Sequence, residues 1–170
     1  MMPAVFEGYL PYLGHRTYYR VVGDLEESLA SGRVPLVTLH GGPGSTHNYM
    51  ELLDCVADDG RAIVSYDQIG CGKSYLEGHP ELWDVETWLG ELEALVAWLN
   101  LRRFHLLGQS WGGMLALTYL TRHVATVGAD RGACSVVLSS TLPSSQLWGR
   151  EQHRMARQLP ADEWAALREA

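Results

Sequence analysis

The fold of this chain is decided by the stretch Leu106-Leu107-Gly108-Gln109-Ser110-Trp111-Gly112-Gly113-Met114. An apolar run predicts a buried strand over 104–107, and an apolar helical pattern follows from Gly112 to Leu120. Between them stands G-x-S-x-G, which is typical of a sharp strand-to-helix turn that lifts a serine hydroxyl clear of a sheet. Gly108 and Gly112 leave room for the strand and the helix to pack closely.

Ser110 is therefore a candidate nucleophile. It stands at the start of the predicted helix, where unpaired N–H groups and the helix dipole favour negative charge. The Trp111 amide is then a candidate donor to an oxyanion that develops beside the serine. The pentapeptide by itself is also compatible with a glycine-rich turn that contains an incidental serine.

A second glycine-rich loop follows a short apolar strand expected at 34–39. It reads His40-Gly41-Gly42-Pro43-Gly44, so its backbone N–H groups are unobstructed by side chains and are available to an anion. A plain turn before a helix at 48–57 explains the same residues.

A third loop, Asp67-Gln68-Ile69-Gly70-Cys71-Gly72-Lys73-Ser74, follows an apolar strand expected at 62–66. Its Gly-x-Gly-Lys-Ser ending lacks the four-residue spacing of a phosphate-binding loop. We therefore expect a turn held by the Asp67 carboxylate rather than a nucleotide site.

Two runs rich in Tyr and Val, at 7–13 and 16–22, predict an antiparallel hairpin at a sheet edge. The polar segment 23–33 is expected to be a loop. A further buried strand is predicted at 135–140, after a turn at Asp130-Arg131-Gly132.

Asp84 predicts the N-cap of a helix that extends to Leu99, with an apolar stripe that leaves out Glu86, Glu91 and Glu93. Ser144-Ser145 predicts the start of a helix through Gln158, and another helix is expected at 161–169. Strands that alternate with helices predict an α/β protein with a mainly parallel central sheet.

The length and composition of the chain are those of one globular domain. The chain has 170 residues, 46% of them hydrophobic and 19% charged, with a net charge of −7. That charge argues against nucleic acid or an anionic membrane as a partner. Three scattered cysteines are too few for a disulfide framework or a zinc site, so we expect no metal and no cofactor. Residues 1–7 do not have the pattern of a signal peptide, and we expect a cytoplasmic location.

The three loops, in this order at strand ends, resemble proline iminopeptidase (prolyl aminopeptidase), a serine peptidase family of the α/β-hydrolase fold. The resemblance spans about 7–145. It implies that residues 1–141 are the N-terminal part of the hydrolase core and 142–170 the beginning of the helical cap. The chain is then truncated after the sixth strand and the start of this lid.

The resemblance also implies roles for individual residues. Ser110 would be the nucleophile, with the Trp111 amide and the Gly42 amide as the oxyanion hole and Gly41 as a second choice for Gly42. The substrate would be a peptide with an N-terminal proline. The site would be shaped by the two glycine-containing loops and the turn around the serine, namely by His40, Gly41, Pro43, Gly44, Asp67, Gln68, Gly108 and Gly112.

The catalytic acid and base are not found in the sequence. In this fold they follow the serine in the order Asp or Glu, then His. The histidines after Ser110 are His123 and His153, and the aspartates are Asp130 and Asp162; no pair fits this order and position. Two alternatives therefore stay open: another, esterase-like α/β-hydrolase, and a non-catalytic relic or binding module. We also expect self-association through the open edge of the strand at 135–140.

Overall fold

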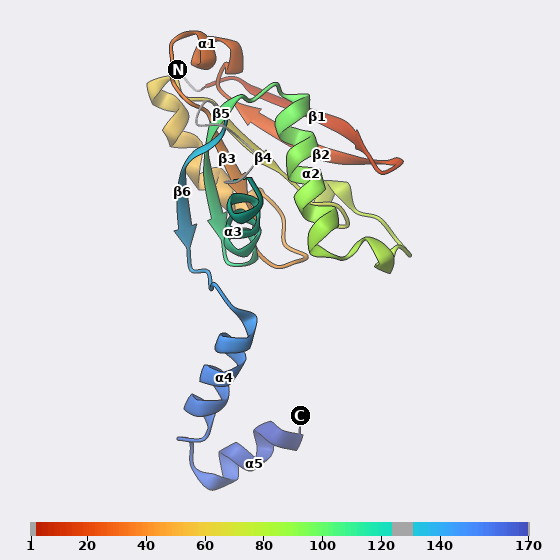
Figure 1. The fold of residues 1–170 in the computed structure, drawn as a ribbon, viewed down its shortest axis with the longest axis vertical. Coiled ribbons are helices and arrows are strands. Elements are labelled where there is room, and N and C mark those ends of the chain that lie inside the picture. Colours follow the sequence, from red (N-terminus) through yellow and green to blue (C-terminus); the bar gives the residue numbers. More distant parts are fainter. Residues whose placement is uncertain (1–2, 124–130, 170) are drawn as a thin grey trace.

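A mixed sheet forms the centre of the protein in a computed structural model that describes residues 3–123 and 131–169 (Figure 1). Within these residues the strand order is β1-β2-β4-β3-β5-β6. The hairpin β1–β2 is antiparallel and lies at one edge, whereas β3, β4, β5 and β6 pair in parallel. The strands are β1 Val5–Tyr12, β2 His15–Val22, β3 Leu36–Leu39, β4 Ile63–Tyr66, β5 Arg103–Gln109 and β6 Gly132–Ser139. The predicted α/β architecture is confirmed, although Asp130 of the expected turn lies outside the described residues.

Alternation along the strands builds a core on each face of the sheet. Val37 pairs with Val64 on one side and with Leu106 on the other, and all three belong to the larger hydrophobic cluster. Their neighbours Leu36 and Ile63 pair with one another and belong to the smaller cluster. Because successive side chains point to opposite faces, a strand buried on both faces is mostly apolar, as the sequence indicated. The exceptions are Thr38 and Ser65, whose buried hydroxyl groups bond to each other at 2.9 Å.

The helices cover these two faces. α2 (Val85–Trp98) and α3 (Trp111–His123) lie side by side in front of the sheet (Figure 1). The opposite face is covered by a 3₁₀ helix, η1 (Asn48–Asp59), through Ala57. Asp84 caps α2, because its carboxylate accepts the Thr87 amide at 2.9 Å. Two short 3₁₀ turns, η2 (Gly72–Ser74) and η3 (Pro80–Leu82), complete this part.

One prediction about local structure is wrong, and another is refined. The segment expected to be a loop contains a short helix, α1 (Leu25–Ala30), because Asp24 accepts the Glu27 amide and caps it. The helix expected at 48–57 is present over Asn48–Asp59 and is a 3₁₀ helix, in which the Met50 amide bonds back to the His47 carbonyl at 2.8 Å. A contact outside the helix fixes its start, since the amide of His47, the residue before the helix, donates to the Asp67 carboxylate.

The expectation that Glu91 lies outside the apolar stripe of α2 is also wrong. Glu91 is completely buried, because two groups across the core satisfy its carboxyl group. The Thr17 hydroxyl of β2 bonds to one oxygen, and the Ile69 amide donates to the other at 2.9 Å. The helical spacing of Trp88, Glu91 and Leu95 places Glu91 on the buried face, but the groups that satisfy its carboxyl group come from distant parts of the chain and leave no local signal.

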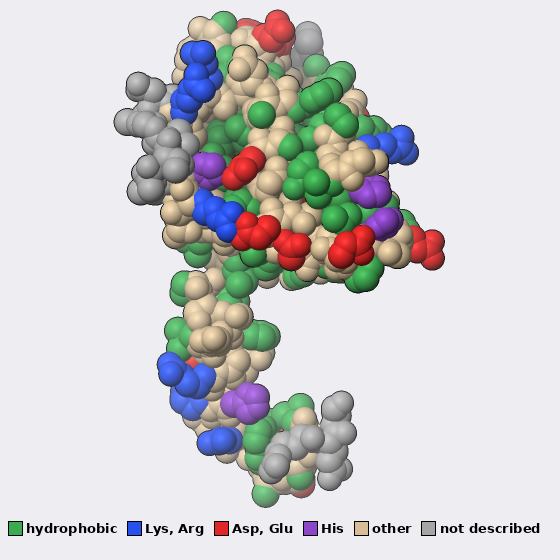
Figure 2. All heavy atoms as spheres, turned by 45° about the vertical axis from the view of Figure 1, so that its right-hand side comes forward, with side chains coloured by type: hydrophobic (Ala, Val, Ile, Leu, Met, Phe, Trp, Pro, Cys, Tyr) green, Lys and Arg blue, Asp and Glu red, His purple; other side chains and the backbone are tan. Residues whose placement is uncertain are grey.

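The last two helices lead away from the sheet (Figure 1). α4 (Ser145–Ala156) is capped by Ser144, as predicted, and α5 is Ala161–Glu169. Their surface carries both basic and hydrophobic side chains (Figure 2), and Trp148 and Met155 of α4 are half exposed. No helix in the described ranges has the length and apolar character that crossing a bilayer demands.

We propose that the 170-residue chain, expressed by itself, self-associates through β6. This strand pairs with β5 on one side, and its Val137 is 50% exposed. Val137→Lys should therefore raise the monomer fraction, because a charge on an open edge disfavours intermolecular pairing. Size-exclusion chromatography with light scattering measures this. Val5→Lys on the opposite edge strand is the matched control, and an equal effect of both changes would contradict a role for β6.

Candidate active site

Three loops meet where β3, β4 and β5 end. Because these strands are parallel, their carboxyl ends lie at the same edge of the sheet. The loop after β3 and the turn after β5 are in close approach: a Cβ added to Gly41 would lie 3.2 Å from the Ser110 Cβ. The structure thus brings together the two motifs that the sequence separates by many residues.

The turn at Ser110 has the strained backbone that the motif predicts. Ser110 has φ of +52°, in the left-handed region that non-glycine residues seldom adopt. Its amide donates to the Ser139 carbonyl at 2.9 Å, and the Thr141 hydroxyl donates to the Ser110 carbonyl at 2.7 Å. These bonds from the end of β6 fix the turn while the serine side chain stays only partly buried.

Gly112 is required by the packing of this turn against β3. A Cβ at Gly112 would lie 2.1 Å from the Leu39 carbonyl oxygen and 2.7 Å from that of His40. Gly108 is equally confined, because its Cβ would lie 2.3 Å from the Gly112 carbonyl oxygen. Any side chain at either position would push α3 and the serine away from the loop after β3.

The backbone N–H groups around Ser110 are not equally available. Gly41 donates its amide to the Tyr49 hydroxyl at 2.7 Å, and Tyr49 in turn donates to Gln109 Oε1 at 2.7 Å. Trp111 is the first residue of α3, so its amide has no partner within the helix. Gly42 has φ of +123°, and a Cβ there would lie 2.5 Å from the Gly44 nitrogen.

His40 is a structural anchor of its loop. Its ring is completely buried, with Nδ1 2.8 Å from the Gly41 carbonyl oxygen and Nε2 accepting the Gln68 amide at 3.0 Å. Burial lowers the pKa of His40, despite the opposing effect of the Gly41 hydrogen bond, so the ring is neutral. Both of its nitrogens are occupied, which leaves His40 unable to accept a proton from Ser110.

Gln68 links the loop after β4 to the other two. Its side-chain amide donates to the His40 carbonyl at 3.0 Å, and its Oε1 accepts the indole N–H of Trp111 at 3.0 Å. The Trp111 ring also packs edge-on against Trp88 of α2, with ring centroids 5.0 Å apart. The side chain of the residue after Ser110 is therefore held from two sides.

The Asp67 carboxylate holds the turn that follows β4, as the sequence predicts. One oxygen accepts the His47 amide at 2.8 Å and lies 2.7 Å from His47 Nδ1, while the other accepts the Lys73 amide at 2.8 Å. Burial raises the pKa of Asp67, but the hydrogen bonds from His47 and Lys73 outweigh it and keep the pKa below the ordinary 3.8. Asp67 is therefore ionised at neutral pH and joins two loops.

Cys71 lies in the same turn but is not poised to react. Its thiol is buried, and burial raises its pKa to about 11. Within the described ranges no three His, Cys, Asp or Glu side chains form a cluster able to bind a metal ion.

No histidine of the chain is placed to activate Ser110. His123 ends α3, about 18 Å along the helix axis from Trp111 at ~1.5 Å per residue, and it pairs with Glu93 at 2.7 Å. His153 bonds to the Gly149 carbonyl of α4. The other rings are engaged elsewhere, in contacts of His15 with His79, of His47 with Asp67, of His79 with Glu81 and of His105 with Ser135.

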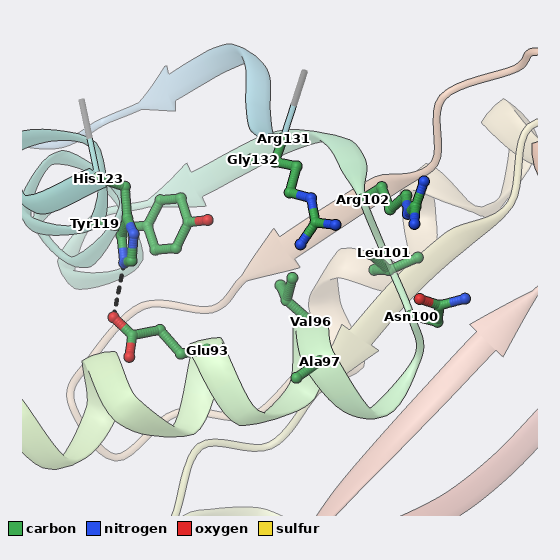
Figure 3. A pocket seen from close by; sticks show the side chains of 10 residues that line it. All are labelled: Glu93, Val96, Ala97, Asn100, Leu101, Arg102, Tyr119, His123, Arg131 and Gly132. Carbon is green, nitrogen blue, oxygen red and sulfur yellow. Dashed lines mark hydrogen bonds and ion pairs between the residues drawn. The ribbon is translucent and has the colours of Figure 1, made fainter. Parts of the chain in front are cut away.

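A pocket of about 470 Å³ lies far from Ser110, between α2 and α3 near the start of β6 (Figure 3). It is lined by Val96, Tyr119 and Arg131 among others, and the His123–Glu93 pair lies at one end. The residues that line it include no serine or cysteine, and none of them belongs to the three loops around Ser110. The candidate active site is the open region over Ser110 and not this pocket.

Sequence reasoning missed His47, Tyr49 and Glu91, which connect the loops. His47 and Tyr49 follow the glycine-rich loop within a few residues, and this position in the sequence already indicates that they lie near the candidate site. Their partners, Asp67 and Gln109, lie about 20 and 60 residues further along the chain. Which groups they bond to follows from the sheet order and not from local pattern.

The sequence of this chain matches a family of known proteins. The family described as alpha/beta hydrolase fold matches residues 34–164. The chain belongs to this family. The matched range includes all three loops of the candidate site and extends into α5.

The chain is also similar to individual hydrolases. It is 52% identical over 168 residues to a proline iminopeptidase of Lactobacillus helveticus and 49% identical over 166 residues to one of Clostridioides difficile, in each case over 98% of this chain and 54% of the relative. The crystal structure of a Mycobacterium smegmatis proline iminopeptidase matches with a TM-score of 0.76 and 32% identity, over 96% of this chain and 53% of the other. The chain thus spans about half the length of the curated relatives it matches.

Removal of the charge on Asp67 should destabilise the protein in a pH-dependent way. At pH 7, Asp67→Asn should lower the free energy of unfolding by about 2–4 kcal/mol, because Asn offers one acceptor oxygen in place of two. A lowered pKa gives stability that is fully present above the unfolded-state value and is lost as pH falls from there through the folded-state pKa, so the difference should shrink below about pH 4. Urea unfolding at pH 7 and pH 3 measures it. Asp58→Asn, an exposed control, should change little, and a pH-independent deficit would contradict the ionic role.

Proposed function

We propose that the protein carrying this chain is a serine aminopeptidase that releases N-terminal proline from peptides. The observation that carries the proposal is the approach of the His40–Gly44 loop to the strained Ser110 turn. A serine hydroxyl facing free backbone amides is the arrangement that acyl transfer from an amide requires. The similarity to proline iminopeptidases over nearly the whole chain supports this substrate over an ester.

In this proposal Ser110 Oγ attacks the carbonyl carbon of the N-terminal residue. The negative charge that develops on the carbonyl oxygen is accepted by the amides of Trp111 and Gly42. Gly41 is the weaker choice because its amide already donates to Tyr49. The base that takes the Ser110 proton returns it to the departing nitrogen, so that collapse of this intermediate expels the amine of the shortened peptide; water, deprotonated by the same base, then releases the amino acid from the serine.

The base and the acid are proposed to come from outside these residues. A serine without a base is a weak nucleophile at neutral pH, and each histidine here is engaged away from Ser110. We therefore propose that residues 1–141 are part of the hydrolase core and 142–170 the start of a cap. The genomic sequence past codon 170 tests this directly: an in-frame Asp and then His at strand ends supports it, and a stop codon favours a non-catalytic chain.

Ser110→Ala in the complete protein should abolish the release of proline from a chromogenic prolyl amide. Loss of the nucleophile lowers turnover by on the order of 10⁶-fold, because the covalent step is removed. Circular dichroism should show an unchanged fold, since Ala differs only by the hydroxyl. Full activity in this variant would exclude Ser110 as the nucleophile. Hydrolysis of an acetate ester in preference to the prolyl amide by the wild-type protein would favour an esterase.

Gly42→Val should lower kcat by roughly 10²-fold, because a displaced oxyanion donor is worth about 3 kcal/mol in the transition state. Steady-state kinetics on a prolyl amide separates this from a loss of affinity. Gly44→Ala is the matched control: Gly44 also has a positive φ, of +105°, but a Cβ there meets nothing within 4 Å, so the loss should be much smaller. A change in KM alone for Gly42→Val would mean that the loop only binds substrate.

A further inference from the structure

Glu91 has an unusual position for a charged residue of a helix. It lies on the face of α2 that packs against the sheet, and none of it is exposed. The Thr17 hydroxyl bonds to Oε1, and the Ile69 amide donates to Oε2 at 2.9 Å. A carboxyl group so placed is costly unless hydrogen bonds compensate it, because burial removes its hydration.

The same face of α2 binds both polar groups of the Ile69 backbone. Trp88 stands one helical turn before Glu91, and its indole N–H donates to the Ile69 carbonyl at 3.4 Å while Glu91 accepts the Ile69 amide. Ile69 itself is buried and belongs to the main core cluster. The loop after β4 is thereby fixed at this residue by α2.

Ile69 is adjacent to Gln68, the residue that links the loop to the candidate active site. Gln68 bonds to His40 through its backbone amide and to the Trp111 indole through its side chain. A displacement of Ile69 would therefore move Gln68, and with it the residue that follows Ser110. The path from Glu91 to Trp111 is a continuous series of hydrogen bonds and packed groups.

We propose that Glu91 is a positioning residue: through Ile69 and Gln68 its buried carboxyl group sets the position of Trp111 beside Ser110. This inference rests on the proposed function, in which the Trp111 amide stabilises the oxyanion. Glu91 does not touch the reacting atoms, so its effect is on the geometry of the donor. A shift of about 1 Å in such a group is enough to slow catalysis about 10²-fold.

The protonated form of Glu91 fits its surroundings. Burial raises its pKa to about 8 against the lowering effect of the hydrogen bonds from Thr17 and Ile69, and the Asp67 charge raises it further. The other titratable groups that act in this region are neutral at pH 7, namely Tyr12, Tyr66 and Cys71. Protonated Glu91 can donate to Thr17 and still accept the Ile69 amide. Ionisation favours states in which water reaches the carboxylate, and these states loosen the loop.

Two variants separate this role from simple stability. Glu91→Gln keeps one donor and one acceptor and cannot ionise, so it reproduces the protonated acid. Glu91→Leu removes both bonds. Glu93→Gln, two residues further on the same helix, is the matched control, because Glu93 is half exposed and pairs with His123 outside the site.

The first measurement is NMR on the complete protein with ¹⁵N labelling, which does not depend on activity. In the wild type, the Ile69 amide and the Trp111 indole resonances should shift together, with an apparent pKa of about 8. In Glu91→Gln neither should titrate, and in Glu93→Gln both should. In Gln68→Leu the Ile69 amide resonance should still change with pH, whereas the Trp111 indole resonance should no longer do so. A Trp111 resonance that does not follow Glu91 in the wild type would overturn the inference.

The second measurement is the pH profile of kcat on a prolyl amide. Wild type and Glu93→Gln should lose turnover above about pH 8, whereas Glu91→Gln should not, and Glu91→Leu should lose roughly 10²-fold in kcat with KM little changed. An alkaline limb that persists in Glu91→Gln would overturn the inference while leaving the peptidase assignment intact. Coupled NMR titration in a protein without any peptidase activity would support the positioning of Trp111 and refute the proposed function.

Discussion

The contact between Gly112 and the end of β3 is the constraint on which the candidate site depends. A Cβ at Gly112 would lie 2.1 Å from the Leu39 carbonyl oxygen, so only glycine permits this separation. The contact brings the start of α3 against the first residues of the loop after β3. Ser110 and that loop can face each other only because these two backbones touch. The distance between Ser110 and the loop after β3 thus depends on the missing side chain at Gly112, because the atoms that a Cβ would meet are backbone atoms of β3 and its loop.

Polar groups then fix the loops that the close packing brings together. Asp67 bonds to the loop after β3 through His47 and closes its own turn through Lys73. Gln68 connects His40 to Trp111, and Tyr49 connects Gly41 to Gln109. The bonds of Asp67 with His47, of Gln68 with His40 and Trp111, and of Tyr49 with Gln109 each join two of the three loops. Removal of one partner would leave a buried group unsatisfied, which costs more than the bond itself contributes.

Much of the fold follows from local pattern. The mostly apolar strand expected at 62–66, the cap at Asp84 and the Ser110 turn each carry their own signal, and the structure confirms all three, with the strand at Ile63–Tyr66. The order of the loops along the chain also identified the edge of the sheet where they meet, because parallel strands end on the same side.

The remaining features depend on tertiary contacts. The α1 helix is a capped helix of only 6 residues in a polar segment, and nothing in its periodicity distinguishes it from a loop. Glu91 has the residue type of a solvent-exposed position but is buried, because Thr17 and Ile69 come to it from distant segments. Residues that connect loops are hidden from sequence patterns for the same reason: their partners are chosen by the folded sheet.

The loop after β4 is anchored by two buried carboxyl groups whose pKa values move in opposite directions. Asp67 accepts three donor groups and stays ionised, with its pKa below the ordinary value. Glu91 accepts fewer, lies near the Asp67 charge, and has its pKa raised to about 8. Two negative charges in one core would repel, so the donors that keep Asp67 charged favour the proton on Glu91. The Asp67 anchor weakens in acid and the Glu91 anchor in alkali, since each loses its preferred form there. The loop that supports Trp111 is therefore held most firmly between these limits, around neutral pH.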